Sequence, residues 1–232
     1  MSRLALAAAV LAVLLSAGCS HGSRRSEDAC ARARAEATVR IGQHVLRGDV
    51  DGDGVPDAVA LVRSRRAPAR CGALLVVRTH ERTLTRALRT TPIPQVPSLN
   101  GLAALGSRRG LEIVVTTWQG ASTAFARVYA VAANRISPVA TGTPDGTFPY
   151  EGSVTHLNAI DCTGKLVVAS GWFERGTSSF GFYRRFYRVR DGRFALVRSE
   201  TGTSHSPVPG RHLREFREPQ PFPSCMRVRA AS

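Results

Sequence analysis

A stretch of closely spaced aspartates constrains the fold of this chain more than any other segment. Residues 48–61 read GDVDGDGVPDAVAL, in which Gly54 allows a sharp turn and a strand-like apolar run follows. Calcium takes about six to eight oxygen ligands, and acids at this spacing would repel one another without a cation. The predicted ligands of one calcium ion are the side chains of Asp49, Asp51, Asp53 and Asp57 and the main-chain carbonyl of Val55. A solvated turn between two strands is the alternative.

The loop is not an EF-hand, because its twelfth position counted from Asp49 is Ala60, not glutamate, and a strand-like run follows. The pattern D-x-D-G-D-G-x-x-D before an apolar strand instead resembles the FG-GAP/VCBS repeats of extracellular, integrin-like β-propellers. The pattern is complete once. The resemblance implies blade-like antiparallel sheets and a calcium ion held at the loop.

Two later segments match the strand that follows the aspartate loop. The strands expected to start at Asp57, Glu112 and Lys165 begin 55 and 53 residues apart, and each is followed by further strand-like stretches. Such a period is typical of propeller blades. Only Glu112 and Asp161 remain where the second and third units would carry acids, so one calcium site is predicted, with the other loops held by an ion pair or a disulfide.

The predicted fold is therefore all-β and mostly antiparallel, a partial propeller-like array of about three four-stranded units after a short N-terminal helical segment. Three units are fewer than the four to eight blades of a closed ring. An open arc, a sandwich-like stack of sheets and half of a dimeric ring are the alternatives, and similar hairpins without a true repeat are a further one. The predicted units span residues 39–95, 96–150 and 151–203.

The N-terminus has the three-part design of a secretory signal. An arginine precedes an apolar run that ends in L-S-A-G-C, which resembles the lipobox of bacterial lipoproteins. The resemblance implies cleavage after residues 1–18 and a lipid on Cys19. Residues 19–38 are expected to form a tether and the short helical segment. The predicted location is extracytoplasmic, anchored by lipid to the bacterial cell membrane, with plain secretion as the alternative.

Four cysteines remain once Cys19 is assigned to the lipid. An even number in an exported chain indicates two disulfides, for which three connectivities exist. We favour Cys30 with Cys71 and Cys162 with Cys225. The second pair would hold the Pro- and Arg-rich residues 204–232, which show no strand pattern, against the domain.

The charge balance is strongly basic, with a formal net charge of +15. An anionic envelope polymer or a protein is therefore a possible partner besides the membrane, although an arginine-rich genome composition also accounts for the charge. The arginines are scattered and no nucleic-acid-binding motif is present, so no nucleic-acid partner is expected.

No catalytic fingerprint occurs in the chain, and no catalytic residue is assigned. Ser153, His156 and Asp161 are close in sequence, but a triad is defined by geometry. His205 and His212 are expected to be solvated. Trp118 and Trp172, with Phe173 and Tyr183, offer a possible ligand surface or pack in the core. The predicted function is a calcium-stabilised binding or scaffolding module. An envelope hydrolase or carbohydrate-active enzyme is the alternative, and a decoy without a ligand is a third.

Overall fold

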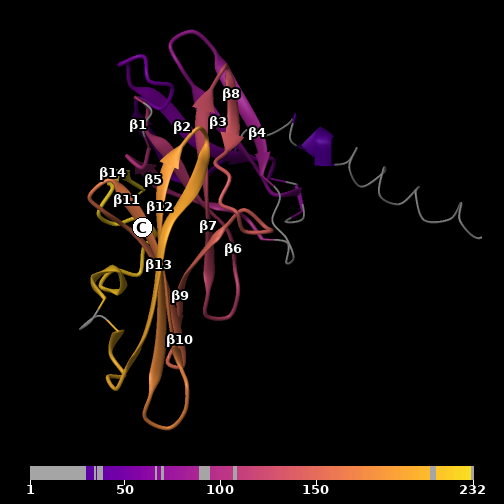
Figure 1. Ribbon diagram of the computed structural model, residues 1–232. Helices are drawn as coiled ribbons and strands as arrows, with labels where there is room; N and C mark the ends of the chain where they lie inside the picture. Colours follow the sequence, from indigo (N-terminus) through magenta and orange to yellow (C-terminus); the bar gives the residue numbers. More distant parts are fainter. Residues whose placement is uncertain are drawn as a thin grey trace, which may run out of the picture.

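The described part of the chain forms a stack of antiparallel β-layers (Figure 1). The computed structural model describes residues 30–33, 35, 39–65, 67–68, 71–88, 95–106, 109–209 and 213–230, without the side chains of 39–44. The predicted signal segment, Cys19 and His212 lie outside these residues. Residues 30–33 and 35 are helical, as predicted for the segment before the first strand. Within the described part, no helix has the length and apolar character to cross a membrane.

The first layer is a four-stranded antiparallel meander in the order β1-β2-β3-β4. Its strand β2 alternates buried and half-buried side chains, with Asp57, Val59 and Leu61 on the buried face, as a strand covered on one side should. The strands of this layer are β1 (Val39–Gly48), β2 (Asp57–Arg63), β3 (Ala73–Arg78) and β4 (Thr83–Leu88).

The second and third predicted units are joined in one ten-stranded sheet. The second layer consists of β5 (Ser98–Ala103), β6 (Glu112–Gln119), β7 (Ala124–Ala132), β8 (Arg135–Pro138) and β14 (Met226–Arg229). The third layer consists of β9 (Phe148–Ser153), β10 (His156–Thr163), β11 (Leu166–Glu174), β12 (Phe180–Arg190) and β13 (Arg193–Ser204).

Strand β9 is the element that joins these layers, and separate four-stranded units were the sequence-based expectation. Strand β8 is only four residues long and pairs with the C-terminal end of β7, leaving the edge at Ala124–Ala126 unpaired. Strand β9 pairs with that open edge, through Ala124 with Tyr150 and Ala126 with Phe148. An unpaired edge is a ready template for a further strand, which explains the fifth strand of the third unit.

Strand β6 lies in the middle of the stack, and the sequence shows why. All of Glu112–Thr117 is buried, with no alternation of exposed side chains. Ile113 and Val115 join the core shared with the first layer, whereas Val114 joins the core shared with the third layer. A strand covered on both faces reads as a continuous buried run. The pairing of the described residues leaves both sheets open at their edges, so the observed architecture is all-β and mostly antiparallel.

The C-terminal segment packs back on the domain, as predicted, but it also contains a strand that the sequence analysis did not expect. After the 3₁₀ turn η3 (Arg214–Phe216), the fully buried Phe222 enters the core, and β14 pairs antiparallel with β5. Met226 and Val228 of β14 pack against the two cores. Four residues carry too little periodicity to indicate a strand without the partner edge of β5.

Two disulfides link the elements. Cys30 joins Cys71 with a Cα–Cα distance of 5.1 Å, and Cys162 joins Cys225 with a Cα–Cα distance of 5.8 Å. These are the pairs that the sequence analysis favoured. The bridges indicate that the protein folds in an oxidising, extracytoplasmic environment.

Candidate metal centre

The aspartate loop connects β1 to β2, and it packs against the equivalent loop of the second layer, which connects β5 to β6. Gly52 and Gly54 have φ values of +88° and +91°, which favour glycine. A Cβ added to Gly110 would lie 2.6 Å from the Val50 carbonyl oxygen, so the two loops are in backbone contact. The Leu111 amide donates to the Asp49 carbonyl over 2.8 Å. The loop is therefore fixed in shape by its neighbour.

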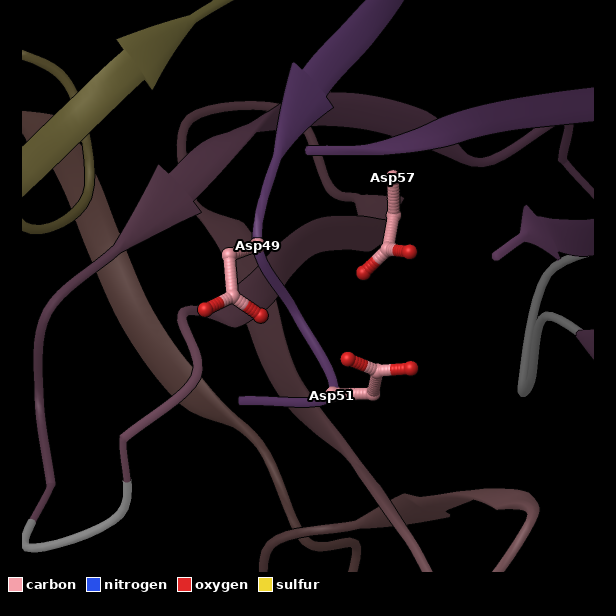
Figure 2. A group of neighbouring side chains, drawn as sticks. All are labelled: Asp49, Asp51 and Asp57. Atoms are coloured by element: carbon pink, nitrogen blue, oxygen red, sulfur yellow. The ribbon is translucent and has the colours of Figure 1, made fainter. Parts of the chain in front are cut away.

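Three of the predicted ligands come together in this loop. Asp49, Asp51 and Asp57 each offer a carboxylate oxygen, and these three oxygens lie within 4.8 Å of one another. Figure 2 shows the carboxylates of Asp51 and Asp57 facing each other, with Asp49 at the side of the same space. Oxygen atoms at this separation can coordinate one hard cation.

Backbone amides of the loop orient the carboxylates, beginning with those of Asp49 and Asp51. Asp49 accepts from the Gly52 amide at 2.6 Å and from the Gly54 amide at 2.9 Å. The carboxylate of Asp51 accepts from the Asp53 amide at 3.2 Å. These bonds fold the main chain around the acids. Each carboxylate oxygen has more than one lone pair, so the bonds leave acceptor capacity for a cation.

Asp57 is the residue that points most directly to a ligand. Its side chain is 1% exposed, and Oδ2 accepts from the Val50 amide at 2.9 Å. Its Oδ1 is buried and has no hydrogen-bond partner among the described residues. Burial raises the pKa of the Asp57 carboxyl, and the negative charges of Asp51 and Asp53 raise it further, against the lowering by the backbone hydrogen bonds. A cation would satisfy the free oxygen and remove the repulsion.

Asp53 lies in the loop but outside this group of three. Its Oδ2 is 2.8 Å from Nδ1 of His80, and its Oδ1 accepts from the Val55 amide at 2.7 Å. The side chain of Val55 is 45% exposed. Ligation by Asp53 would require its carboxylate to leave His80, and ligation by Asp53 and by the Val55 carbonyl stays a prediction.

The second layer carries an equivalent acid. The Glu112 Oε2 accepts from the Leu105 amide at 2.9 Å, and the Asp57 Oδ2 accepts from Val50, in both cases seven residues earlier. Both acids open the second strand of their layer and bind the amide at the start of the preceding loop. The two acids therefore occupy equivalent places in the first and second layers.

The third layer departs from this pattern. Lys165 lies in the tight turn between β10 and β11, and Asp161 lies within β10. The Asp161 carboxylate accepts from the backbone amide and the hydroxyl of Ser224 at 2.7 and 2.6 Å. Asp161 therefore holds the C-terminal segment, next to the Cys162–Cys225 bridge.

The tryptophans of the predicted ligand surface lie at matching places in two layers. Trp118 stacks on Phe125 with ring centroids 3.9 Å apart, and Trp172 stacks on Phe180 at 4.3 Å. Trp172 is 3% exposed, so its assignment to a ligand surface is wrong: it packs in the interior. Trp118 is half-buried. Phe173, next to Trp172, is 39% exposed instead.

The residues tested for a catalytic triad are not arranged as one. Ser153 Oγ lies 3.0 Å from Nδ1 of His156, but Nε2 of that ring lies 3.2 Å from the Thr123 hydroxyl. Asp161 is an odd number of residues from His156 along β10, so its side chain is on the opposite face of the sheet. A triad needs the acid on the far ring nitrogen.

Comparison of this chain with protein-family models, with curated proteins and with solved structures found no match. The fold and the loop together define an all-β, disulfide-bonded protein with a group of three aspartates, of which Asp57 is buried, that can hold a metal ion.

Proposed function

We propose that this chain is a cell-envelope lipoprotein whose calcium-stabilised β domain acts as a binding or scaffolding module. The observation that carries the proposal is the buried Oδ1 of Asp57, which lacks a donor within the described residues, on a carboxylate grouped with those of Asp49 and Asp51. A buried, unpaired carboxylate oxygen is costly, and a bound cation offsets that cost.

Calcium fits this donor set better than magnesium. The available groups are carboxylate oxygens and a main-chain carbonyl on a loop, and calcium accepts such flexible sets with water completing the shell. Magnesium demands near-ideal octahedral geometry at shorter distances and retains its waters. Asp53 and Val55 complete the proposed shell once the Asp53 carboxylate exchanges His80 for the ion.

The layers resemble consecutive propeller blades in their arrangement. The first is an antiparallel meander, the second contains one in β5–β8, and β10–β13 form another in the third. The Asp57 and Glu112 hydrogen bonds recur at the same place in two of them. This supports an FG-GAP/VCBS-like, partial propeller as the finer description of the fold.

We expect calcium to raise the melting temperature of the wild-type protein and EDTA to reverse the effect. Binding to the folded state alone adds about 2.7 kcal/mol at a hundredfold excess over Kd. In Asp51→Asn, which keeps the side-chain shape but removes one charge, the shift should be largely lost. Thermal unfolding with EDTA, calcium or magnesium measures it.

The matched control for the calcium experiment is Asp191→Asn, in the exposed turn between β12 and β13. Asparagine tolerates the φ of +51° at this position, so the control should keep the full calcium shift. If calcium does not raise the melting temperature of the wild type, the aspartate loop is a polar turn and not a calcium site.

The lipid anchor is tested separately. Cys19→Ser removes the thiol that would carry the lipid, so in a bacterial host the variant should leave the detergent phase in phase partitioning. Wild type and Ser23→Ala should both stay in that phase. A Cys19→Ser protein that still partitions into detergent contradicts the anchor.

A further inference from the structure

Part of the inner face of the third layer is not covered by the second layer. Val167, Ala169 and Tyr187 on this face lie in the core shared with the second layer. Further along the same strands and on the same face lie Phe173, which is 39% exposed, and the exposed Arg185. The strands β10–β13 continue as long hairpins at this end of the molecule (Figure 1).

Two glycines allow aromatic rings to lie across this face. Gly171 is paired with Tyr183, and a Cβ on Gly171 would lie 2.2 Å from Cε1 of that ring. Gly181 is paired with Phe173, and a Cβ there would lie 2.6 Å from Cζ of that ring. The space above each glycine is therefore filled by its neighbour's ring, which leans over the strand with one side turned away from the sheet.

Cations and hydroxyls surround these rings. The Arg185 guanidinium lies 5.2 Å from the centroid of Tyr183, and the Arg175 stem would contact a Cβ on Gly181 at 2.7 Å. Neither guanidinium is in an ion pair with another described residue. We call the set the aromatic–guanidinium platform: Phe173, Arg175, Tyr183, Arg185, Ser199, Thr201 and Thr203.

The platform lines an open hollow of about 480 Å³ that has no carboxylate in its wall. Aromatic faces stack on the apolar faces of sugar rings, and a row of hydroxyls can bond to sugar hydroxyls. Guanidinium groups bind carboxylate, sulfate or phosphate in a two-pronged way. A ligand with both sugar rings and anionic groups uses all three kinds of side chain.

We infer that the aromatic–guanidinium platform binds a polyanionic glycan. The inference names the ligand class for the binding module and so rests on the proposed function, although it uses residues remote in sequence from the aspartate loop. A single-stranded nucleic acid would also stack on aromatic rings, but such grooves follow the phosphate backbone with a longer track of cations. The two guanidiniums and the row of hydroxyls favour the glycan.

The test is a titration of the full-length protein, in detergent and with calcium, with oligogalacturonate as the probe. We expect Tyr183→Ala and Arg185→Gln each to weaken binding about tenfold or more, because one loses stacking and the other a charged hydrogen-bonding partner. Tyr183→Phe should bind within about twofold of the wild type, since it keeps the ring. The matched control is Arg188→Gln, which removes one exposed charge from the opposite face of β12 and should leave affinity unchanged.

Several outcomes would overturn the inference. Equal weakening by Arg188→Gln would mean that the net positive charge attracts any polyanion. Equal binding of neutral maltoheptaose would remove the anionic specificity, and tighter binding of oligo(dT) would favour a nucleic acid. No binding of oligogalacturonate while calcium still raises the melting temperature would overturn the platform alone, whereas loss of the calcium shift with binding retained would overturn the metal site alone.

Discussion

Replacing Arg184 by alanine should lower the free energy of unfolding by about 3–5 kcal/mol, because it leaves the buried carboxylate of Glu215 without its guanidinium. The Glu215 side chain is 0% exposed, and its Oε1 lies 2.8 Å from Nε of Arg184. Ser170 donates its hydroxyl to the same oxygen. A neutral hydroxyl cannot compensate a buried charge alone. Urea unfolding followed by tryptophan fluorescence would report the loss.

An exposed ion pair in the C-terminal segment, which also contains Glu215, provides the control for this prediction. Arg229 pairs with Glu218 at 3.2 Å, and both side chains are about half exposed, at 47% and 50%. Arg229→Ala should therefore cost at most about 1 kcal/mol. The double variant Arg184→Leu with Glu215→Leu should recover part of the loss, since apolar replacements of a buried pair are often tolerated. An Arg184→Ala protein as stable as Arg229→Ala would contradict the anchoring role of the buried pair.

The parts of the fold that could be predicted from sequence are those that depend on patterns within short segments of the chain. The apolar runs starting at Asp57 and Glu112 predicted strands β2 and β6, and the favoured pairing of Cys162 with Cys225 followed from the expectation that the C-terminal segment is held against the domain. The β7–β9 pairing could not be predicted, because it depends on β8 being too short to cover its neighbour's edge. The same holds for β14, a four-residue strand defined by its partner β5.

The candidate metal centre was also predicted only in part. The spacing of Asp49, Asp51 and Asp57 was sufficient to place three carboxylates around one point. The contact between Asp53 and His80 was missed, although a signal for it existed. In an antiparallel meander the first and third connections lie at the same end of the sheet, so the β3–β4 turn that carries His80 had to face the aspartate loop.

The platform residues were only partly indicated by sequence. Phe173 and Tyr183 were named with the tryptophans as aromatic candidates, but the sequence could not separate exposed rings from buried ones. Strand alternation decides it: Trp172 faces the side covered by the C-terminal segment, and Phe173 faces the open side. The role of Gly171 and Gly181 requires the cross-strand register, which no local pattern encodes.

Removing the Cys162–Cys225 bridge should be the other strongly destabilising change. The bridge closes a chain separation of 63 residues, for which loop-closure entropy corresponds to about 4 kcal/mol. In a domain of this size that loss lowers the melting temperature by roughly 10 °C. The double variant Cys162→Ala with Cys225→Ala avoids a free thiol, and calorimetry would measure the shift.

Hydrogen exchange can localise the effect of this bridge, with the Cys30→Ala and Cys71→Ala double variant as the control. The Ala104 amide donates to the Cys225 carbonyl over 3.0 Å, just before β14, and the Ala230 amide donates to the Asn100 carbonyl over 2.9 Å, just after β14. These two hydrogen bonds extend the pairing of β14 with β5 at both of its ends. Without the Cys162–Cys225 bridge these amides should lose protection first, because the chain entering β14 is then tied to β10 by hydrogen bonds alone, such as those between Ser224 and Asp161. The control closes a similar loop of 41 residues but ties only the short helix to the start of β3, so it should spare them. Equal protection of the Ala104 and Ala230 amides in both variants would show that β14 stays in place without the bridge.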